Sequence, residues 1–400
     1  MQETKKIFWP LMKNCITADD KTAMIEFIQK SDRFTNGPQV KEFEKQWSKW
    51  LGVDFSLFVS SGSTANFLLV SAIIEKYQLQ KGDKVIVPAM TWVTNIGPII
   101  QLGLQPIFCD VDPRTFSFDL KHLQLLATQH DDIKLVFVSH LFGVFADIHS
   151  YKKILPSSIF IEDVCESHGA NFQGKKAGTF SSGSTFSFYY GHHMTTVEGG
   201  FVCTSDADLY EIMKCKRSHG LAREASPEAF NKYQLENPDV HPQFLFGTDG
   251  YNFRNTEINA VLGLSQLKRL DENNRLRGLN LKRFLKIIEK IDFLDAEFRT
   301  EGSCSFCLIF LCSSHEQKID LETCLSTSGI ETRPLCSGNL LKQPFLSDYR
   351  LEVDGRPNVE ELHECGFFIG NNHLISDGDF LKLEKLLNEF AEKQKNNEKK

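Results

Sequence analysis

The chain lacks three features that would place it in common functional classes. No apolar run of its 400 residues approaches the roughly 18 residues that a membrane helix needs. Basic residues are not in excess, because 45 Lys and Arg stand against 52 Asp and Glu, a formal net charge of -7. That balance gives no reason to expect nucleic acid or an anionic membrane as a partner. No apolar signal core follows the first six residues, so we expect a cytoplasmic protein.

Cysteine spacing typical of metal sites is also scarce. Eleven cysteines are present, and most, such as Cys109 and Cys203, lie inside apolar runs, as small buried residues do in a reducing compartment. Cys304 and Cys307 form a C-x-x-C pair. However, residues 305–312 are patterned as a buried strand, and no second pair follows at zinc-finger spacing. We therefore expect no metal site, and the role of this pair stays open.

Length and patterning predict an α/β enzyme built from two domains. Four hundred residues exceed one usual hydrophobic core, and we place a large domain at 1–265 and a small C-terminal α+β domain at 266–400. The last nine residues are polar and are expected to fray. Short apolar runs alternate with helical stretches, which predicts a mostly parallel sheet covered by helices on both faces. The expected strands are 84–87, 106–109, 135–138, 159–161 and 306–311, and the expected helices are 64–77, 120–129, 257–284, 320–326 and one from 378.

The start of the predicted helix near Thr64 is suited to bind a phosphate. Small residues and hydroxyls follow an apolar strand there, in the order Ser60-Ser61-Gly62-Ser63-Thr64-Ala65-Asn66. A helix N-terminus presents free N–H groups and a positive dipole to an anion. The same residues would serve equally well as an N-cap turn. Gly62, Ser63 and the nearby Thr64 are the candidate ligands.

Further candidates lie where predicted strands end, which is the edge of a parallel sheet where ligands gather. Trp92 follows strand 84–87 and is either a core or interface residue or a clamp for a flat ring. Asp163 stands just after the apolar strand 159–161, and Glu166 follows it in the loop. Taken alone, Asp163 would equally well cap the next helix.

The stretch from Ser187 to Gly200 carries the most informative residue, His192. Ser187-Phe188 is followed after three residues by His192-His193. Thr195-Thr196 comes one residue later, and a Glu198-Gly199-Gly200 turn follows after Val197. An imidazole can move protons, but it cannot bond to a cofactor aldehyde as a lysine does. Adjacent histidines on a strand point to opposite faces, so we expect no shared metal and a structural role for His193.

Together these motifs resemble the nucleotide-sugar aminotransferases, which are fold type I enzymes that use pyridoxal 5'-phosphate (PLP). The resemblance covers nearly the whole chain. In that family a lysine stands where this chain has His192, and a histidine there points to sugar dehydratases. The resemblance assigns cofactor contacts to Gly62, Ser63, Thr64, Trp92, Asp163, Glu166, Ser187 and Asn252, and contacts with substrate or glutamate to Phe34, Thr35, His219, Arg223, Arg254 and Arg333.

The resemblance implies a specific reaction. The C3 hydroxyl would leave a nucleotide-linked 4-keto-6-deoxy sugar, with GDP-4-keto-6-deoxy-D-mannose expected first, and L-glutamate would regenerate pyridoxamine 5'-phosphate (PMP). The products would be ammonia and a 4-keto-3,6-dideoxy sugar for a colitose-type surface glycan such as an O-antigen. His192 would move the protons. Asn252 would reach the cofactor phosphate of a neighbouring subunit, which implies a homodimer with composite sites.

Other functions remain open from the sequence. A 3-dehydratase acting on a CDP- or UDP-linked 4-keto sugar would share the same motifs. One such relative also needs an iron–sulfur cluster, but this chain has no cysteine between Cys215 and Cys304, where the cluster ligands fall, so we expect none. A catalytically silent protein that binds nucleotide sugars or regulates transcription is the other alternative. The retained Asp163, Ser187 and Asn252 argue against it.

Overall fold

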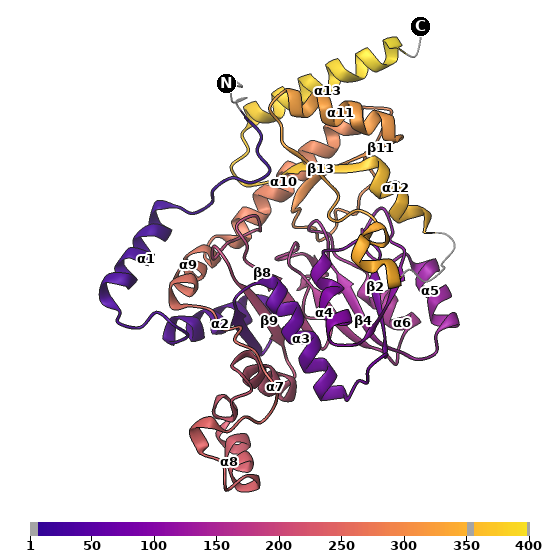
Figure 1. Cartoon of the computed structure of the whole chain (residues 1–400). Coiled ribbons are helices and arrows are strands. Elements are labelled where there is room, and N and C mark those ends of the chain that lie inside the picture. Colours follow the sequence, from indigo (N-terminus) through magenta and orange to yellow (C-terminus); the bar gives the residue numbers. More distant parts are fainter. Residues whose placement is uncertain (1–6, 350–355, 398–400) are drawn as a thin grey trace.

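The structure, a computed structural model, describes residues 7–349 and 356–397 (Figure 1). Its centre is a seven-stranded sheet in the order β1-β9-β8-β5-β4-β2-β3. Strands β3, β2, β4, β5 and β8 run parallel to one another, and β9 is antiparallel to both of its neighbours. The predicted α/β fold with a mostly parallel sheet is confirmed. The strands are β1 (Phe55–Val59), β2 (Lys84–Pro88), β3 (Gln105–Cys109), β4 (Ile133–Ser139), β5 (Ile159–Asp163), β8 (Gly183–Ser187) and β9 (Gly200–Thr204).

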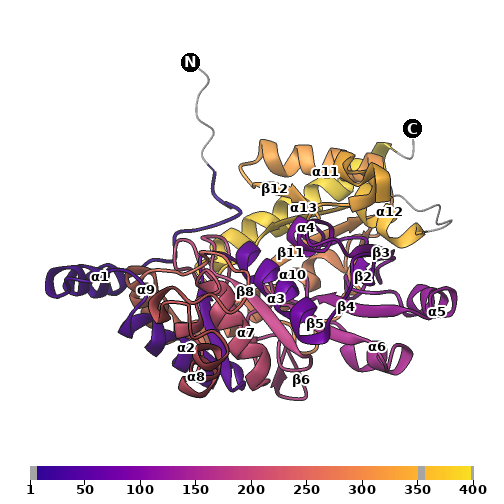
Figure 2. The ribbon, with the colours of Figure 1, turned by 60° about the horizontal axis from the view of Figure 1, so that its bottom comes forward.

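Helices bury an apolar core on each face of this sheet, as the fully buried central strands require. One core contains side chains of α3, α4 and α7, and the other contains side chains of α2, α5, α6 and α9. The helix α1 projects from the body at the left of Figures 1 and 2, and α8 lies in a lobe at the bottom of Figure 1. These helices are α1 (Ala18–Lys30), α2 (Pro38–Leu51), α3 (Gly62–Tyr77), α4 (Gly97–Gln101), α5 (Leu120–Gln129), α6 (Ile148–Ile154), α7 (Ala207–Arg217), α8 (Pro227–Glu236) and α9 (Glu257–Leu267).

Helix α2 illustrates how the sequence specifies these elements. Its buried residues Val40, Phe43, Trp47 and Leu51 recur at helical spacing and form one apolar stripe. Proline stands at its first turn, and Gly52 ends it with a left-handed φ of 92°, a conformation that glycine adopts without steric cost. The stripe packs on the sheet, where Trp47 stacks on a phenylalanine of β9.

A second, antiparallel sheet in the order β10-β11-β13-β12 carries its own core with α10, α11 and α13. Figure 2 shows this smaller part above the large sheet. Its elements are α10 (Leu270–Ile288), β10 (Leu294–Asp295), β11 (Cys307–Cys312), α11 (His315–Thr327), β12 (Thr332–Pro334), α12 (Pro357–Cys365), β13 (Gly366–Gly370) and α13 (Asp377–Asn397). The shorter elements are β6 (Asn171–Phe172), β7 (Lys175–Lys176), η1 (Val93–Asn95), η2 (Ala222–Glu224), η3 (Pro242–Phe244), η4 (Leu340–Lys342) and η5 (Pro344–Tyr349).

The structure differs from the predicted organisation in three places. The helix expected over 257–284 is divided into α9 and α10, and Arg269, at the break, bonds Asp20 of α1. Trp9, which we grouped with the large domain, is 2% exposed and packs in the core of the small sheet. The tail expected to fray continues as α13 to Asn397, and Lys395 pairs with Asp292 at 2.9 Å; residues 398–400 lie outside the described part. The boundary at 265/266 stays a prediction.

Candidate active site

Four strands of the large sheet end at one edge, and the residues that follow them surround a cavity of about 450 Å³. Strands β2, β4, β5 and β8 are parallel neighbours, so their carboxyl ends meet at that edge. The small sheet closes the opposite side of the cavity. Eight of the residues predicted from the sequence line it, namely Gly62, Ser63, Trp92, Asp163, Glu166, Ser187, His192 and Arg333.

The first turn of α3 opens into this cavity. Ser61 caps the helix by accepting a hydrogen bond from the Thr64 N–H at 3.1 Å. The N–H groups of Gly62 and Ser63 have no acceptor within the part of the chain that the structure describes, and such groups at a helix start suit an anion. A Cβ at Gly62 would lie 2.5 Å from the Ser187 Cβ, so only glycine lets Ser187 approach. Thr64 is not part of the lining, because its hydroxyl bonds the Ser61 backbone.

The carboxylate of Asp163 is held by amide side chains at the end of β5. Its Oδ2 accepts hydrogen bonds from Asn66 Nδ2 and Asn95 Nδ2, each at 2.9 Å, and its Oδ1 accepts one from the Cys165 N–H at 2.8 Å. Asn66 is itself held by Thr185, whose hydroxyl lies 2.5 Å from its Oδ1. These bonds fix the orientation of a 7% exposed carboxylate that faces the cavity.

Glu166 lies beside Asp163 but in a more apolar setting. Its Oε2 accepts one hydrogen bond, from the Phe142 N–H at 3.1 Å. Burial raises the pKa of Glu166 to about 7, and the neighbouring Asp163 charge acts in the same direction. The Glu166 carboxyl can therefore carry a proton near neutral pH, so it can donate as well as accept a hydrogen bond.

His192 stands on a turn rather than on a strand. Residues 188–199 connect β8 to β9, and the His192 N–H bonds the Tyr189 carbonyl at 3.0 Å. The premise that the two histidines lie on a strand is wrong, so the alternation of side chains in extended backbone does not apply to them. Both rings lie against Phe306, with centroids at 5.7 and 5.9 Å. His193 is 1% exposed and its Nε2 lies 3.2 Å from the Cys304 carbonyl, whereas His192 reaches the cavity.

The surroundings of His192 favour its neutral form. Burial lowers its pKa to about 3, and the positive charge of Arg277 contributes. Arg277 is 5% exposed and donates to the backbone carbonyls of Phe306 and Asn371. No carboxylate pairs with Arg277 among the ion pairs of the described residues. The His168 ring, whose centroid lies 5.9 Å from that of His192, is likewise kept neutral by burial, which lowers its pKa.

Three predicted residues form a separate exposed group outside the cavity. Ser218 and Asn252 pair as an isolated antiparallel bridge. Arg254 donates to Asn252 Oδ1 at 3.1 Å, and its Nη2 lies 3.4 Å from His219 Nε2. We call His219, Asn252 and Arg254 the outer polar group. Phe34 and Thr35 are exposed as well and do not line the cavity.

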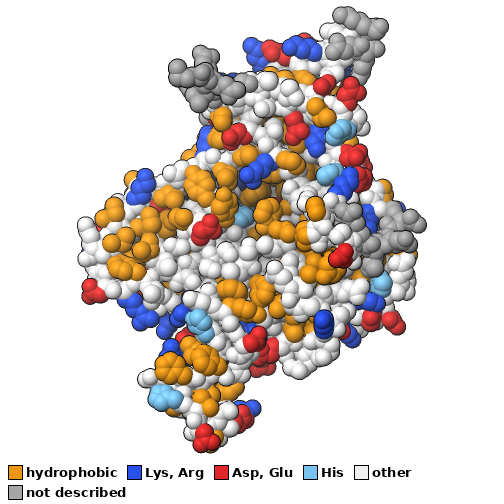
Figure 3. Space-filling model, in the orientation of Figure 1, with side chains coloured by type: hydrophobic (Ala, Val, Ile, Leu, Met, Phe, Trp, Pro, Cys, Tyr) orange, Lys and Arg blue, Asp and Glu red, His pale blue; other side chains and the backbone are white. Residues whose placement is uncertain are grey.

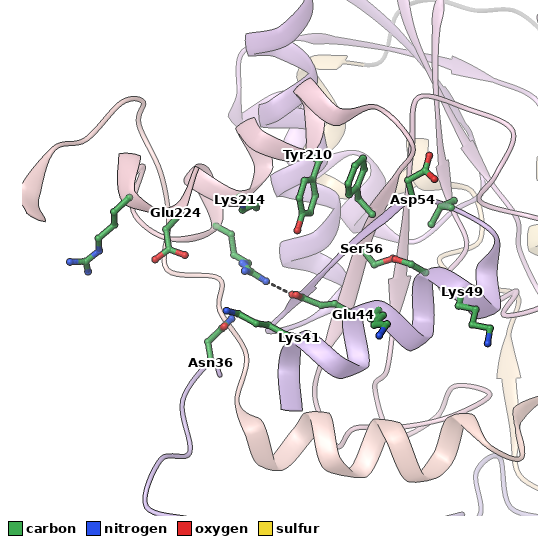
Figure 4. A pocket seen from close by; sticks show the side chains of 15 residues that line it. Asn36, Lys41, Glu44, Lys49, Asp54, Ser56, Tyr210, Lys214 and Glu224 are labelled. Atoms are coloured by element: carbon green, nitrogen blue, oxygen red, sulfur yellow. Dashed lines mark hydrogen bonds and ion pairs between the residues drawn. The ribbon is translucent and has the colours of Figure 1, made fainter. Parts of the chain in front are cut away.

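Arg223 lies at a second cavity, of about 700 Å³, between α2, β1 and α7. Figure 4 shows Lys41 and Lys49 of α2 on one side of it and Tyr210 and Lys214 of α7 on the other. Its charged wall is partly neutralised by an ion pair between Arg217 and Glu44 at 2.6 Å. Arg223 is the one predicted site residue in its lining, so this cavity does not gather the chemistry that the first one does.

The described residues contain no group of three or more His, Cys, Asp or Glu side chains that could hold a metal ion. All eleven cysteines are free thiols, and Cys304 and Cys307 are buried. Cys307 begins β11, as the buried-strand interpretation expected. Within the same described ranges, no helix combines the length and the apolar character needed to cross a membrane.

Four residues of the site were not identified from the sequence. Asn66 is one turn after Gly62 on α3, so helical spacing could have placed it at the same edge. Asn95 follows Trp92 closely and could have been considered with it. His168 and Arg277 gave no local signal, because only the packing of α10 against the loop after β5 brings them near His192.

Comparison with known proteins identifies the family. A model of the DegT/DnrJ/EryC1/StrS aminotransferase family matches residues 15–380. GDP-4-keto-6-deoxy-D-mannose 3-dehydratase of Escherichia coli O55:H7 is 35% identical over 371 residues, which are 90% of this chain and 94% of that protein. The chain belongs to the DegT/DnrJ/EryC1/StrS aminotransferase family, which confirms the resemblance drawn from the motifs.

Two solved structures extend the comparison. The E. coli GDP-4-keto-6-deoxy-D-mannose-3-dehydratase with bound hydrated PLP has a TM-score of 0.85 and 32% identity, covering 96% of this chain and all of the other. A GDP-4-keto-6-deoxymannose-3-dehydratase with a trapped PLP–glutamate geminal diamine has a TM-score of 0.84 and 32% identity, covering 95% and 100%. The fold type I architecture is thereby confirmed.

Proposed function

We propose that the protein is a PLP- and PMP-dependent 3-dehydratase. It removes the C3 hydroxyl of GDP-4-keto-6-deoxy-D-mannose, uses L-glutamate as amino donor and yields ammonia and a 4-keto-3,6-dideoxy sugar. The observation that carries this proposal is the cavity lining, in which His192 faces the space and no lysine takes part among the described residues. A transaminase needs a lysine amine at that place, whereas a dehydratase needs only a base.

The cavity residues fit the cofactor. The open N–H groups of Gly62 and Ser63 and the hydroxyl of Ser187 form a phosphate cradle at a helix start. Trp92, which is 53% exposed, is placed to lie against the ring. Asp163 would face the ring nitrogen, because Asn66 and Asn95 fix its carboxylate. When bound, PLP supplies an electron sink that stabilises negative charge on the neighbouring carbon.

His192 and Glu166 are the proton-carrying groups at this site. Because burial and Arg277 keep the His192 imidazole neutral, one ring nitrogen is free to accept a proton at neutral pH and to return it. Its Nδ1 has no hydrogen-bond partner in the described structure. Glu166, with a pKa raised to about 7, can donate a hydrogen bond to an oxygen of the cofactor or substrate.

We further propose that the protein works as a homodimer in the cytoplasm. Arg333 of β12 lines the cavity and can bind a carboxylate or phosphate, but the outer polar group lies outside its own chain's cavity. A partner subunit would use these residues and bury apolar side chains such as Ile25 and Ile28 of α1, which are 55% and 46% exposed. Figure 3 shows hydrophobic side chains gathered over α1. Free thiols fit a reducing compartment.

Two experiments test the proposed function. Glutamate added to the PLP-loaded protein should convert its absorbance to that of PMP. A panel of GDP-, CDP- and UDP-linked 4-keto sugars, incubated with glutamate and followed by mass spectrometry, should show loss of one oxygen atom from the GDP compound, as hydrogen replaces the C3 hydroxyl. Turnover of only the CDP or UDP compounds would replace the proposed substrate. No spectral change and no turnover would favour a silent binding protein.

Borohydride gives an independent check of the role of His192. It reduces the bond between a lysine and PLP to a permanent one, and an imidazole forms no such bond. We expect all PLP to be released from borohydride-treated, denatured protein. Recovery of a pyridoxyl-lysine peptide by mass spectrometry would contradict the assignment.

A further inference from the structure

The cavity has two walls of different character. The wall from the large sheet is mostly polar, with Ser63, Asn95, Ser139 and Asp163 facing the space. The wall from the small sheet and the N-terminal segment is mostly apolar. Its apolar members include Leu11, Met12, Phe306, Pro334 and Phe368, and its polar members are Arg333 and Asn371.

Residues 8–13, which we call the strap, hold the apolar wall in place. Trp9 donates from Nε1 to the Gly370 carbonyl at 2.8 Å. The Leu11 N–H donates to Glu331 Oε2 at 2.8 Å, and the Glu331 N–H donates to the Trp9 carbonyl at 2.9 Å. A Cβ at Gly370 would lie 2.3 Å from the Leu11 carbonyl oxygen, so the strap lies directly on β13. Leu11 and Met12 are therefore fixed by the small sheet.

Met12 carries this apolar wall to the side of His192. A Cβ on Gly191 would lie 2.3 Å from the Met12 Sδ, so the thioether occupies the space that a side chain at 191 would take. Gly191 does not have the left-handed φ that would itself require glycine. A side chain at 191 would therefore push the flexible Met12 thioether aside, and Met12 takes this space beside the residue that precedes the proton-moving His192.

We propose that Met12 and the strap form the subsite for the C6 methyl group of the sugar and select 6-deoxy substrates. This inference rests on the proposed function. Apart from its ring carbons, the 4-keto-6-deoxy hexose carries hydroxyls, a keto oxygen, the nucleotide diphosphate and a single apolar substituent, the methyl on C5. The carbon C5 neighbours C4, the carbon that must lie near His192. Polar groups buried against Met12 would lose their hydrogen bonds, so the methyl is the substituent that this wall accommodates.

The test compares two stable ligands that differ by one hydroxyl. GDP-6-deoxy-D-mannose and GDP-D-mannose lack the keto group, so they bind without reacting, and calorimetry on the PLP-loaded protein measures both affinities. We expect the wild type to prefer the 6-deoxy compound by at least about tenfold and up to about a hundredfold, the upper figure being what one added hydroxyl costs in an apolar pocket. Met12→Gln, of similar size but polar, should bring the two affinities to within about threefold. Met12→Leu should keep the preference.

A second measurement separates the methyl subsite from general damage and from the proposed reaction. Glutamate has no sugar methyl, so Met12→Gln should change the rate of its conversion of PLP to PMP by a smaller factor than it changes the ratio of the two sugar affinities. Gly191→Ala should displace the Met12 thioether into the cavity and lower the affinity for both GDP sugars. Adding Met12→Ala to the same chain should restore that affinity. Gly278→Ala is the control, because the space around Gly278 is open.

Three results would overturn the proposal. They are equal binding of both ligands by the wild type, a preference that survives Met12→Gln, or a loss of PLP affinity in Met12→Gln with the sugar ratio intact. The last would place Met12 against the cofactor. If the wild type shows the preference but no 4-keto sugar is turned over, the proposed reaction fails and the methyl subsite stands.

Discussion

The cavity wall around His192 and the outer polar group are built in different ways. Asp163 receives three hydrogen bonds from its own chain, and His192 is packed between Phe306 and His168. Arg254, in contrast, touches only Asn252 and His219 among the hydrogen bonds of the described residues. The first region has its geometry set within one subunit, and the second presents polar side chains outward.

This difference separates two tasks of the site. Groups that move protons need an orientation fixed in advance and a controlled pKa, both of which burial supplies. Groups that bind charged phosphates or a partner need to remain accessible. We therefore expect changes in the inner wall to reduce the rate of the chemical step, and changes in the outer polar group to weaken binding or assembly.

The largest effect is expected for His192→Asn. Asparagine keeps the approximate shape and some hydrogen bonding but has no basic nitrogen, so the rate of sugar dehydration should fall by at least ~10². Cofactor retention should survive, because the phosphate and ring contacts lie elsewhere. Single-turnover kinetics and PLP absorbance measure the two quantities.

His193→Asn is the matched control, since His193 is buried and bonds only a backbone carbonyl. Dehydration by this variant should be much less affected than by His192→Asn. If His192→Asn turns over sugar at a near-normal rate, another base carries the reaction, and the inner wall loses its assigned role.

A smaller effect is expected for Asn252→Ala in the outer polar group. If Asn252 reaches the phosphate in a partner's site, PLP affinity should fall by about 1.5–3 kcal/mol, the range for a charge-assisted hydrogen bond. Equilibrium dialysis measures the loss. Thermal unfolding should change little, because Asn252 is exposed.

Mixing subunits sharpens this prediction. In a heterodimer of an Asn252→Ala chain and a His192→Asn chain, one site carries both changes and the other receives an intact His192 and an intact Asn252. Activity above that of either parent would support composite sites. Mixed dimers that form but show no gain would mean that each chain works alone.

The smallest expected effect is a pH shift in Arg277→Met. The neutral imidazole is the active form, and its lowered pKa keeps His192 neutral as the pH falls. Removing the buried positive charge removes one cause of that lowering, so the pKa rises and the acid limb of kcat/KM moves to higher pH, by up to about one unit. Arg277→Lys retains the charge and should keep the limb near its original position. A uniform loss of rate without a shifted limb would instead indicate structural damage.

Local sequence was enough to predict the α/β fold, because strands and helices depend on patterns within a few residues. The end of a predicted strand pointed to Asp163, whereas Ser187 was assigned only through the family resemblance, because the strand that ends at it was not predicted. Local pattern could not show that α10 begins after a break at Arg269, since no helix breaker marks it. It also could not show that Trp9 packs in the small-sheet core, because that contact joins residues more than 300 positions apart.

The sequence by itself determined the chemistry available to the protein: a histidine in place of a lysine, a helix start for phosphate and an acid at the end of β5. The tertiary structure alone decided how that chemistry is tuned and bounded. Arg277 from α10 supplies the positive charge near His192, His168 from the loop after β5 packs against its ring, and Met12 from the strap sets the wall beside it. Electrostatic and steric effects depend on distance in space, and folding brings these four residues together from positions that lie far apart in the chain.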